Sequence, residues 1–283
     1  MSEVTDKLGS IEYMDRYQTA LSQQADYLSK LAVLMPTSDW GNSVRLLAMA
    51  TGDSCKALVL LGDNNHLNEM LMVSRAILER LVNLCYLAVC GPEEVNRFRL
   101  YAIHKGYRKL DREFAGFGVK YTGEVDVSQS PDLQQALSLF TSKDGKELTT
   151  WTTRGLRERV KLIGERTSFP VGLFAILYLT VYEDASEALH GTLYGAGAEH
   201  APFQPKKKEP WDLQTRRLKS HLYMLTSKII AGSITVVSSY LGSQDALRLA
   251  VASRFDWDWP DLKREQDKKL DEFIASGSEP PQE

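Results

Sequence analysis

Apolar residues recur along this chain at the three- and four-residue steps of an α-helix, and stretches that alternate with the period of a β-strand are scarce. This spacing predicts helices at about 5–34, 39–62, 65–89, 92–116, 131–140, 152–165, 168–190, 211–241 and 244–254. The expected fold is therefore all-α, a multi-helix bundle of long antiparallel helices.

Glycine and proline residues mark the expected breaks between these helices. Gly91 and Pro92, for example, separate the third helix from the fourth. Glycine, proline and many small polar residues interrupt residues 117–150, so we interpret this segment as a loop-rich insertion with one short helix. We interpret residues 1–275 as a single helical domain and residues 276–283 as a disordered tail.

Two of the predicted helices, 65–89 and 211–241, carry apolar residues on more than one face. Such a helix belongs at the centre of a bundle, because each apolar face needs a partner. One chain offers few partners for several faces of this kind, so we predict a homodimer. The alternative is that other helices of the same chain cover both segments.

Composition places the chain among soluble globular proteins. Of its 283 residues, 43% are hydrophobic and 25% are charged, and the net charge of −3 excludes a polycation that holds nucleic acid by bulk attraction. The longest apolar run, residues 169–182, is shorter than the roughly 20 residues needed to cross a bilayer. The start of the chain lacks the apolar core of a signal peptide. We therefore expect a cytoplasmic protein without membrane contact.

Cysteine usage agrees with a reducing compartment. The chain has three cysteines, Cys55, Cys85 and Cys90, and no C-x-x-C pair that would suggest zinc or redox chemistry. Cys85 and Cys90 lie in an apolar stretch, where a free thiol packs as a small hydrophobic group.

The first candidate for chemistry is a pair of charges on the otherwise apolar helix at 65–89. Arg75 and Glu79 are four residues apart and therefore share one face of this helix. A charge in such a setting needs a partner, because burying it alone is costly. The pair is either a structural ion pair or part of a polar pocket, in which Arg75 holds an anion and Glu79 orients it or accepts a proton.

A second polar line runs along the helix predicted at 168–190. Tyr182, Ser186 and His190 follow one another at steps of four residues. His190 is either an imidazolium at a helix C-terminus or a group that titrates near neutral pH within a site. Since both lines need polar company, we predict that the two helices face each other and that His190 converges with Arg75 and Glu79.

These residues resemble an uncharacterised family of bacterial helical proteins, a domain of unknown function. The resemblance rests on an S-R-x-x-x-E motif with an N-L-x-Y segment and on a distant Y-x-x-x-S-x-x-x-H motif, and it spans roughly residues 45–195. In this chain the motif positions are Ser74, Arg75, Glu79, Asn83, Leu84, Tyr86, Tyr182, Ser186 and His190. The resemblance implies no activity, only that Arg75, Glu79 and His190 form the site. Ser186, on the same polar line as His190, is a further candidate catalytic residue.

A more distant resemblance is to the HEPN nucleases, small helical dimers that cut RNA without metal. Their signature is an arginine followed by a histidine four to six residues later on a helix. Three pairs are similar to it: Arg99 with His104, Arg97 with His104, and Arg216 with His221. In each, the polar residue usual after the arginine is missing. The resemblance implies that His104 moves a proton from the ribose 2′-OH while Arg99 steadies the phosphate.

A metal site finds little support in the sequence. Glu187 and His190 form one Glu-x-x-His motif, but di-iron bundles need two such motifs and two further carboxylates. The sequence also lacks a G-x-S-x-G elbow, a P-loop and a dinucleotide-binding fingerprint. We therefore expect neither a metal nor a cofactor.

Two classes of function remain open. The first is an enzyme that acts on RNA or another phosphate compound, as an effector in stress or antiviral defence. The second is a non-catalytic binding or sensor protein that works through a protein partner. Catalysis requires Arg75 or Arg99 to share a solvent-reachable cleft with a histidine, whereas arginines held in ion pairs favour the binding class.

Overall fold

A computed structural model describes residues 9–114, 119–122, 126–190 and 211–254. The helices are α2 (Ile11–Leu34), α3 (Asp39–Asp63), α4 (Leu67–Val89), α5 (Pro92–Leu110), α6 (Pro131–Phe140), α7 (Leu156–Arg166), α8 (Val171–Leu177), α9 (Glu183–Leu189), α11 (Trp211–Leu241) and α12 (Gln244–Ala252). A 3-10 turn, η1 (Val127–Gln129), precedes α6, and a π-helix, η2 (Tyr178–Tyr182), connects α8 to α9. The predicted all-α bundle is confirmed.

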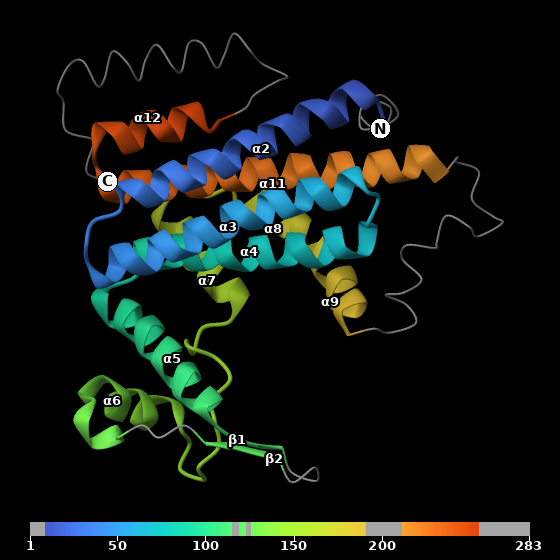
Figure 1. The fold of residues 1–283 in the computed structure, drawn as a ribbon. Coiled ribbons are helices and arrows are strands. Elements are labelled where there is room, and N and C mark those ends of the chain that lie inside the picture. The colour runs from blue at the N-terminus through green and yellow to red at the C-terminus, as the bar shows by residue number, and fades with distance from the viewer. Residues whose placement is uncertain (1–8, 115–118, 123–125, 191–210, 255–283) are drawn as a thin grey trace.

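Four long helices, α2, α3, α4 and α11, form the centre of the bundle and lie side by side (Figure 1). Helix α12 packs on α2 and α11, while α7, η2 and α9 cover a further side of α4. Most of α4 is buried, including both apolar faces that its sequence predicts. The chain's own helices therefore cover α4 and α11, which removes the reason for expecting a second copy at these two segments.

Helix α11 is long and apolar enough to cross a membrane by length and composition. Within the bundle, however, 72% of its most apolar window is buried. The same values are found for the core helix of a globular protein, and α11 packs between α2, α4, α8 and α12.

The insertion differs from the prediction at its start. Helix α5 ends at Leu110 rather than near residue 116, and the chain continues into an antiparallel pair of four-residue strands, β1 (Asp111–Phe114) and β2 (Val119–Thr122). Helix α6 lies where the short helix was predicted and packs on α5. Leu100, Ala136 and Phe140 form a small apolar cluster between α5 and α6, away from the main core.

The single helix predicted at 168–190 is divided into α8, η2 and α9. A π-helix contains one more residue per turn than its flanking α-helical turns, so it rotates the side chains that follow it. Helix α8 begins beside α11, where a Cβ atom on Gly232 would lie 2.5 Å from Cδ of Pro170. The absence of a side chain at Gly232 therefore allows the two helices to approach this closely.

Candidate functional site

The candidate site begins with a polar line on α4. Arg75, Glu79 and Asn83 follow one another at steps of four residues, on the side of the helix that faces α7 and η2. Nε of Arg75 donates to Oε1 of Glu79 at 3.2 Å. The Arg75 side chain is 21% exposed and that of Glu79 is 41% exposed, so this ion pair lies at the edge of the bundle.

Tyr182, the last residue of η2, closes a triangle with this pair. Its hydroxyl donates to Oε1 of Glu79 at 2.8 Å and accepts from Nη2 of Arg75 at 3.2 Å. The guanidinium carbon of Arg75 lies 4.3 Å from the centre of the Tyr182 ring, within the range of a cation–π contact. Burial and the hydrogen bond to Glu79 raise the pKa of Tyr182, so the hydroxyl stays protonated near neutral pH.

A second arginine enters the site from α7. Nη1 of Arg159 donates to the amide oxygen of Asn83, and its guanidinium carbon lies 5.8 Å from the Trp151 ring. Burial lowers the pKa of Arg159, and the charges of Glu79 and Glu94 oppose this shift. Arg159 forms no ion pair with any carboxylate that the structure describes. We call Arg75, Glu79, Asn83, Arg159 and Tyr182 the arginine cluster.

The arginine cluster contains more positive than negative charge. Its one carboxylate is Glu79, and a single oxygen of Glu79 already accepts from both Arg75 and Tyr182. Among the described residues, two buried guanidinium nitrogens, Nη1 of Arg75 and Nε of Arg159, have no hydrogen-bond partner. Leaving buried charged donors unpaired is unfavourable. The cluster is therefore suited to an additional anion.

A stack of side chains leads from this cluster toward the surface. It consists of Tyr182, Tyr178 and Arg157, and we call it the aromatic ladder. The Tyr178 and Tyr182 rings stack at 4.6 Å with an angle of 19° between their planes. The guanidinium carbon of Arg157, an exposed residue of α7, lies 5.1 Å from the centre of the Tyr178 ring. The order Arg157, Tyr178, Tyr182 and Arg75 thus connects the outside of α7 with α4.

The rest of the predicted polar line continues away from the cluster. Ser186 is half-buried, and its carbonyl accepts from the backbone N–H of His190 at 3.0 Å. His190 caps the C-terminus of α9 and is exposed. His190 lies eight positions after Tyr182, which corresponds to about 12 Å along a helix axis. The structure thus brings Tyr182 to Arg75 and Glu79, and gives His190 no side-chain contact with them.

The arginine and histidine of the nuclease-like pair lie apart from the arginine cluster. Arg99 donates to Oδ2 and Oδ1 of Asp132 at 2.5 and 3.0 Å and forms an ion pair with Asp39. His104 is 0% exposed and packs beside Tyr101 and Phe140. Burial lowers the pKa of His104, and neither of its ring nitrogens has a hydrogen-bond partner among the described residues. This placement argues against Arg99 and His104 as a catalytic pair.

The cysteines and a metal site were the remaining candidates for chemistry. Cys55 and Cys85 are buried, and burial raises the pKa of both thiols to about 12. Within the described segments, no three histidine, cysteine, aspartate or glutamate side chains gather so that they could hold a metal ion.

The fold and the site define an all-α protein whose polar cluster joins its central helix to α7 and η2. A family of unknown function, DUF5677, matches residues 43–202, and the chain belongs to this family. The resemblance to an uncharacterised family is thereby confirmed, and the matched segment contains every residue of the arginine cluster. No curated protein and no solved structure matches the chain.

The sequence analysis missed Arg159 and the ladder residues Arg157 and Tyr178. Spacing arguments compare residues within one helix, and Arg159 reaches the site from α7. A weak signal for the ladder was present, since Tyr178 and Tyr182 are four residues apart.

Proposed function

We propose that this protein binds a small anion, a carboxylate or a phosphate group, at the arginine cluster, and that it acts as a binding or sensor protein. The observation that carries the proposal is that, among the described residues, two partly buried arginines have one hydrogen-bonded carboxylate between them, Glu79, while the charge of Glu94 acts more weakly on Arg159. Arg159 bonds only to the neutral amide of Asn83 among the described side chains, while Glu79 is shared by Arg75 and Tyr182.

Guanidinium groups suit this role because they present several N–H donors in a plane. Such donors bind the oxygens of carboxylate and phosphate groups in pairs. An anion bound at the cluster would pair with the unpaired N–H group of Arg75 or of Arg159. The anion would then supply the charge and the hydrogen-bond acceptors that the cluster lacks.

Binding is favoured over catalysis because no described histidine contacts the arginines, and Glu79, the carboxylate of the cluster, is already held by Arg75 and Tyr182. Metal-independent cleavage of RNA needs a group that carries a proton beside the phosphate. His104 is sealed within its apolar cluster, and His190 makes no side-chain contact with the arginines. The Tyr182 pKa is raised, so its hydroxyl remains a donor. We keep one part of the ribonuclease hypothesis, namely the phosphate as a ligand group.

The test is isothermal titration calorimetry with sodium phosphate and with sodium acetate, at an ionic strength held constant with sodium chloride. We expect saturable binding of one of the two anions, with a dissociation constant of roughly 0.1–1 mM. The ligand should also raise the melting temperature, because it binds the folded state.

Two variants separate site binding from general attraction to α7. Arg159→Gln keeps a donor for Asn83 but removes the charge, so the anion should bind at least about tenfold more weakly. Lys161→Gln removes an exposed charge two residues away on the same helix and should leave anion binding unchanged. Equal effects of the two substitutions, or the absence of saturable binding in the unsubstituted protein, would overturn the proposal.

A further inference from the structure

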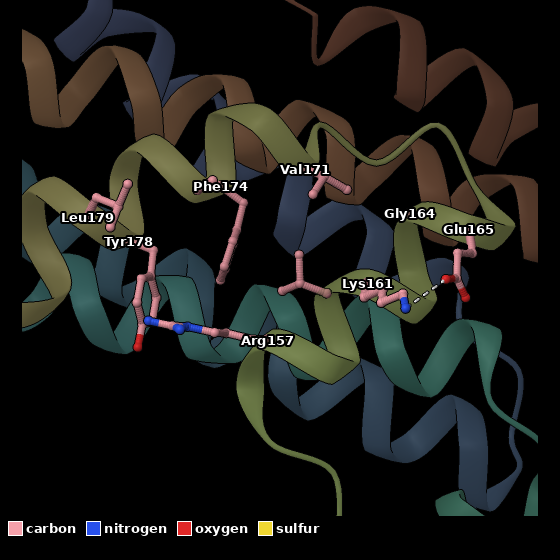
Figure 2. Close-up of a pocket in the computed structure, with 10 residues that line it drawn as sticks. Arg157, Lys161, Gly164, Glu165, Val171, Phe174, Tyr178 and Leu179 are labelled. Carbon is pink, nitrogen blue, oxygen red and sulfur yellow. Dashed lines mark ion pairs between the residues drawn. The ribbon is translucent and has the colours of Figure 1, made fainter.

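A pocket of about 500 Å³ lies between α7 and α8, on the outer side of the aromatic ladder (Figure 2). Its walls are formed by Val160, Gly164, Val171, Phe174, Ala175 and Tyr178. Small-molecule sites in proteins have volumes of this order and are lined mainly by apolar side chains with a few polar groups. The pocket shares no lining residue with the arginine cluster, and the stack of Tyr178 on Tyr182 leads from one to the other.

One uncompensated positive charge lies at the mouth of this pocket. Lys161 is paired with Glu165 at 3.7 Å, as the dashed line in Figure 2 marks. Arg157 forms no ion pair with any described residue and lies beside the Tyr178 ring. An anionic group placed at the mouth would therefore find Arg157 available, with the apolar walls directly next to it.

We propose that this pocket binds an amphipathic monocarboxylate, with its alkyl or aromatic body against Phe174 and Ala175 and its carboxylate paired with Arg157. Leu179, which also lines the pocket, is 69% exposed, and Val171 is 38% exposed. An apolar ligand body would remove both side chains from water. The single charge of Arg157 matches a single carboxylate. This site is separate from the anion site of the arginine cluster and does not depend on it.

The experiment measures binding of decanoate by calorimetry and by displacement of the fluorescent probe 11-(dansylamino)undecanoic acid. We expect saturable binding with one site per chain. Ala175→Trp fills the pocket from an exposed position on α8 and should weaken binding by at least about tenfold. Ile176→Trp is the matched control, because Ile176 is the next residue, is 45% exposed and does not line the pocket.

A second comparison tests the charge. Arg157→Gln should weaken decanoate binding by about tenfold and leave decanol binding unchanged, since decanol has the same body without the carboxylate. The proposal is overturned if the unsubstituted protein does not bind decanoate saturably, if the two tryptophan variants bind equally well, or if Arg157→Gln affects decanol as much as decanoate. Phosphate or acetate binding at the arginine cluster should persist in Ala175→Trp, so the two sites can fail independently.

Cysteine protection provides a measurement that does not depend on a bulky substitution. The natural thiols Cys55 and Cys85 are buried, and burial raises the pKa of the half-buried Cys90 to about 12, so all three should react slowly with maleimide. In Ala175→Cys, decanoate should slow labelling of the new thiol. In Ile176→Cys it should have no effect, and equal protection of both positions would contradict the pocket.

Discussion

At the scale of single residues, the Tyr182 hydroxyl is the contact that joins η2 to α4. Tyr182→Phe keeps the stack on Tyr178 but removes both hydrogen bonds of the hydroxyl. We expect the free energy of unfolding, measured by urea denaturation, to fall by about 1–2 kcal/mol. Tyr178→Phe is the control, because the Tyr178 hydroxyl makes no hydrogen bond with the described residues. A loss as large in the control would show that the hydroxyl contacts of Tyr182 do not matter.

His104 provides a prediction about pH. Burial, with the charges of Arg108 and Lys105, lowers its pKa below the ordinary value of 6.5, while Glu147 opposes the shift. As the pH falls below about 6.5, an unfolded chain protonates this histidine while the folded chain keeps it neutral, so the folded state loses stability. Above that pH both states are neutral, and the effect disappears.

Replacing His104 with leucine should therefore flatten the decline in stability between pH 7 and pH 5. The ring packs among Tyr101 and Phe140 without a hydrogen bond, so an apolar side chain fits the same surroundings. Urea unfolding at several pH values checks this. If the free energy of unfolding falls as steeply between pH 7 and pH 5 in His104→Leu as in the unsubstituted protein, other groups cause the acid sensitivity.

At the scale of elements, the contact between α8 and α11 depends on a glycine. A methyl group at Gly232 would lie 2.5 Å from Cδ and 2.8 Å from Cγ of Pro170, and a proline ring has little freedom to move away. We expect Gly232→Ala to lower the free energy of unfolding by about 1–3 kcal/mol. Gly106→Ala is the control, because Gly106 is exposed on α5 with no atom near its missing Cβ. That change should stabilise the protein by about 0.5–1 kcal/mol.

The elements also show what hydrophobic spacing can and cannot predict. Helix α11 was predicted with its observed bounds, because its apolar pattern is long and Gly242, with φ of +66°, ends it. The end of α5 was missed, since a four-residue strand pair such as β1 and β2 is too short to show a clear alternating pattern.

The site was predicted in part for a related reason. Arg75 and Glu79 could be found because charges stand out on an apolar helix. The π-helix could not be found, because its i→i+5 bonding leaves no distinct spacing in the sequence. It places Tyr182, rather than His190, against the pair. Arg159 was missed because it comes from a different helix.

At the scale of the whole molecule, the expected second copy needs a surface that the chain does not cover itself. Helices α4 and α11 do not provide one. The exposed side of α3 does, because Leu46, Met49 and Leu60 lie along one line of this helix and are 69%, 50% and 64% exposed. Leu46 and Met49 form one apolar part of this side and Leu60 forms another, with the exposed side chains of Asp53 and Lys56 between them. Large exposed apolar side chains are typical of association surfaces, and charges of opposite sign can pair across a twofold axis.

We therefore predict a homodimer in which the outer faces of two α3 helices pack against each other about a twofold axis. Light scattering after size-exclusion chromatography should give twice the chain mass of 31.8 kDa at micromolar concentration. Leu46→Glu would place a charge in this face and should produce a monomer that melts cooperatively. Leu148→Glu alters a leucine that is 39% exposed in the insertion and should leave the dimer intact. A mass near 31.8 kDa for the unsubstituted protein, or dissociation by both substitutions alike, would rule out this interface.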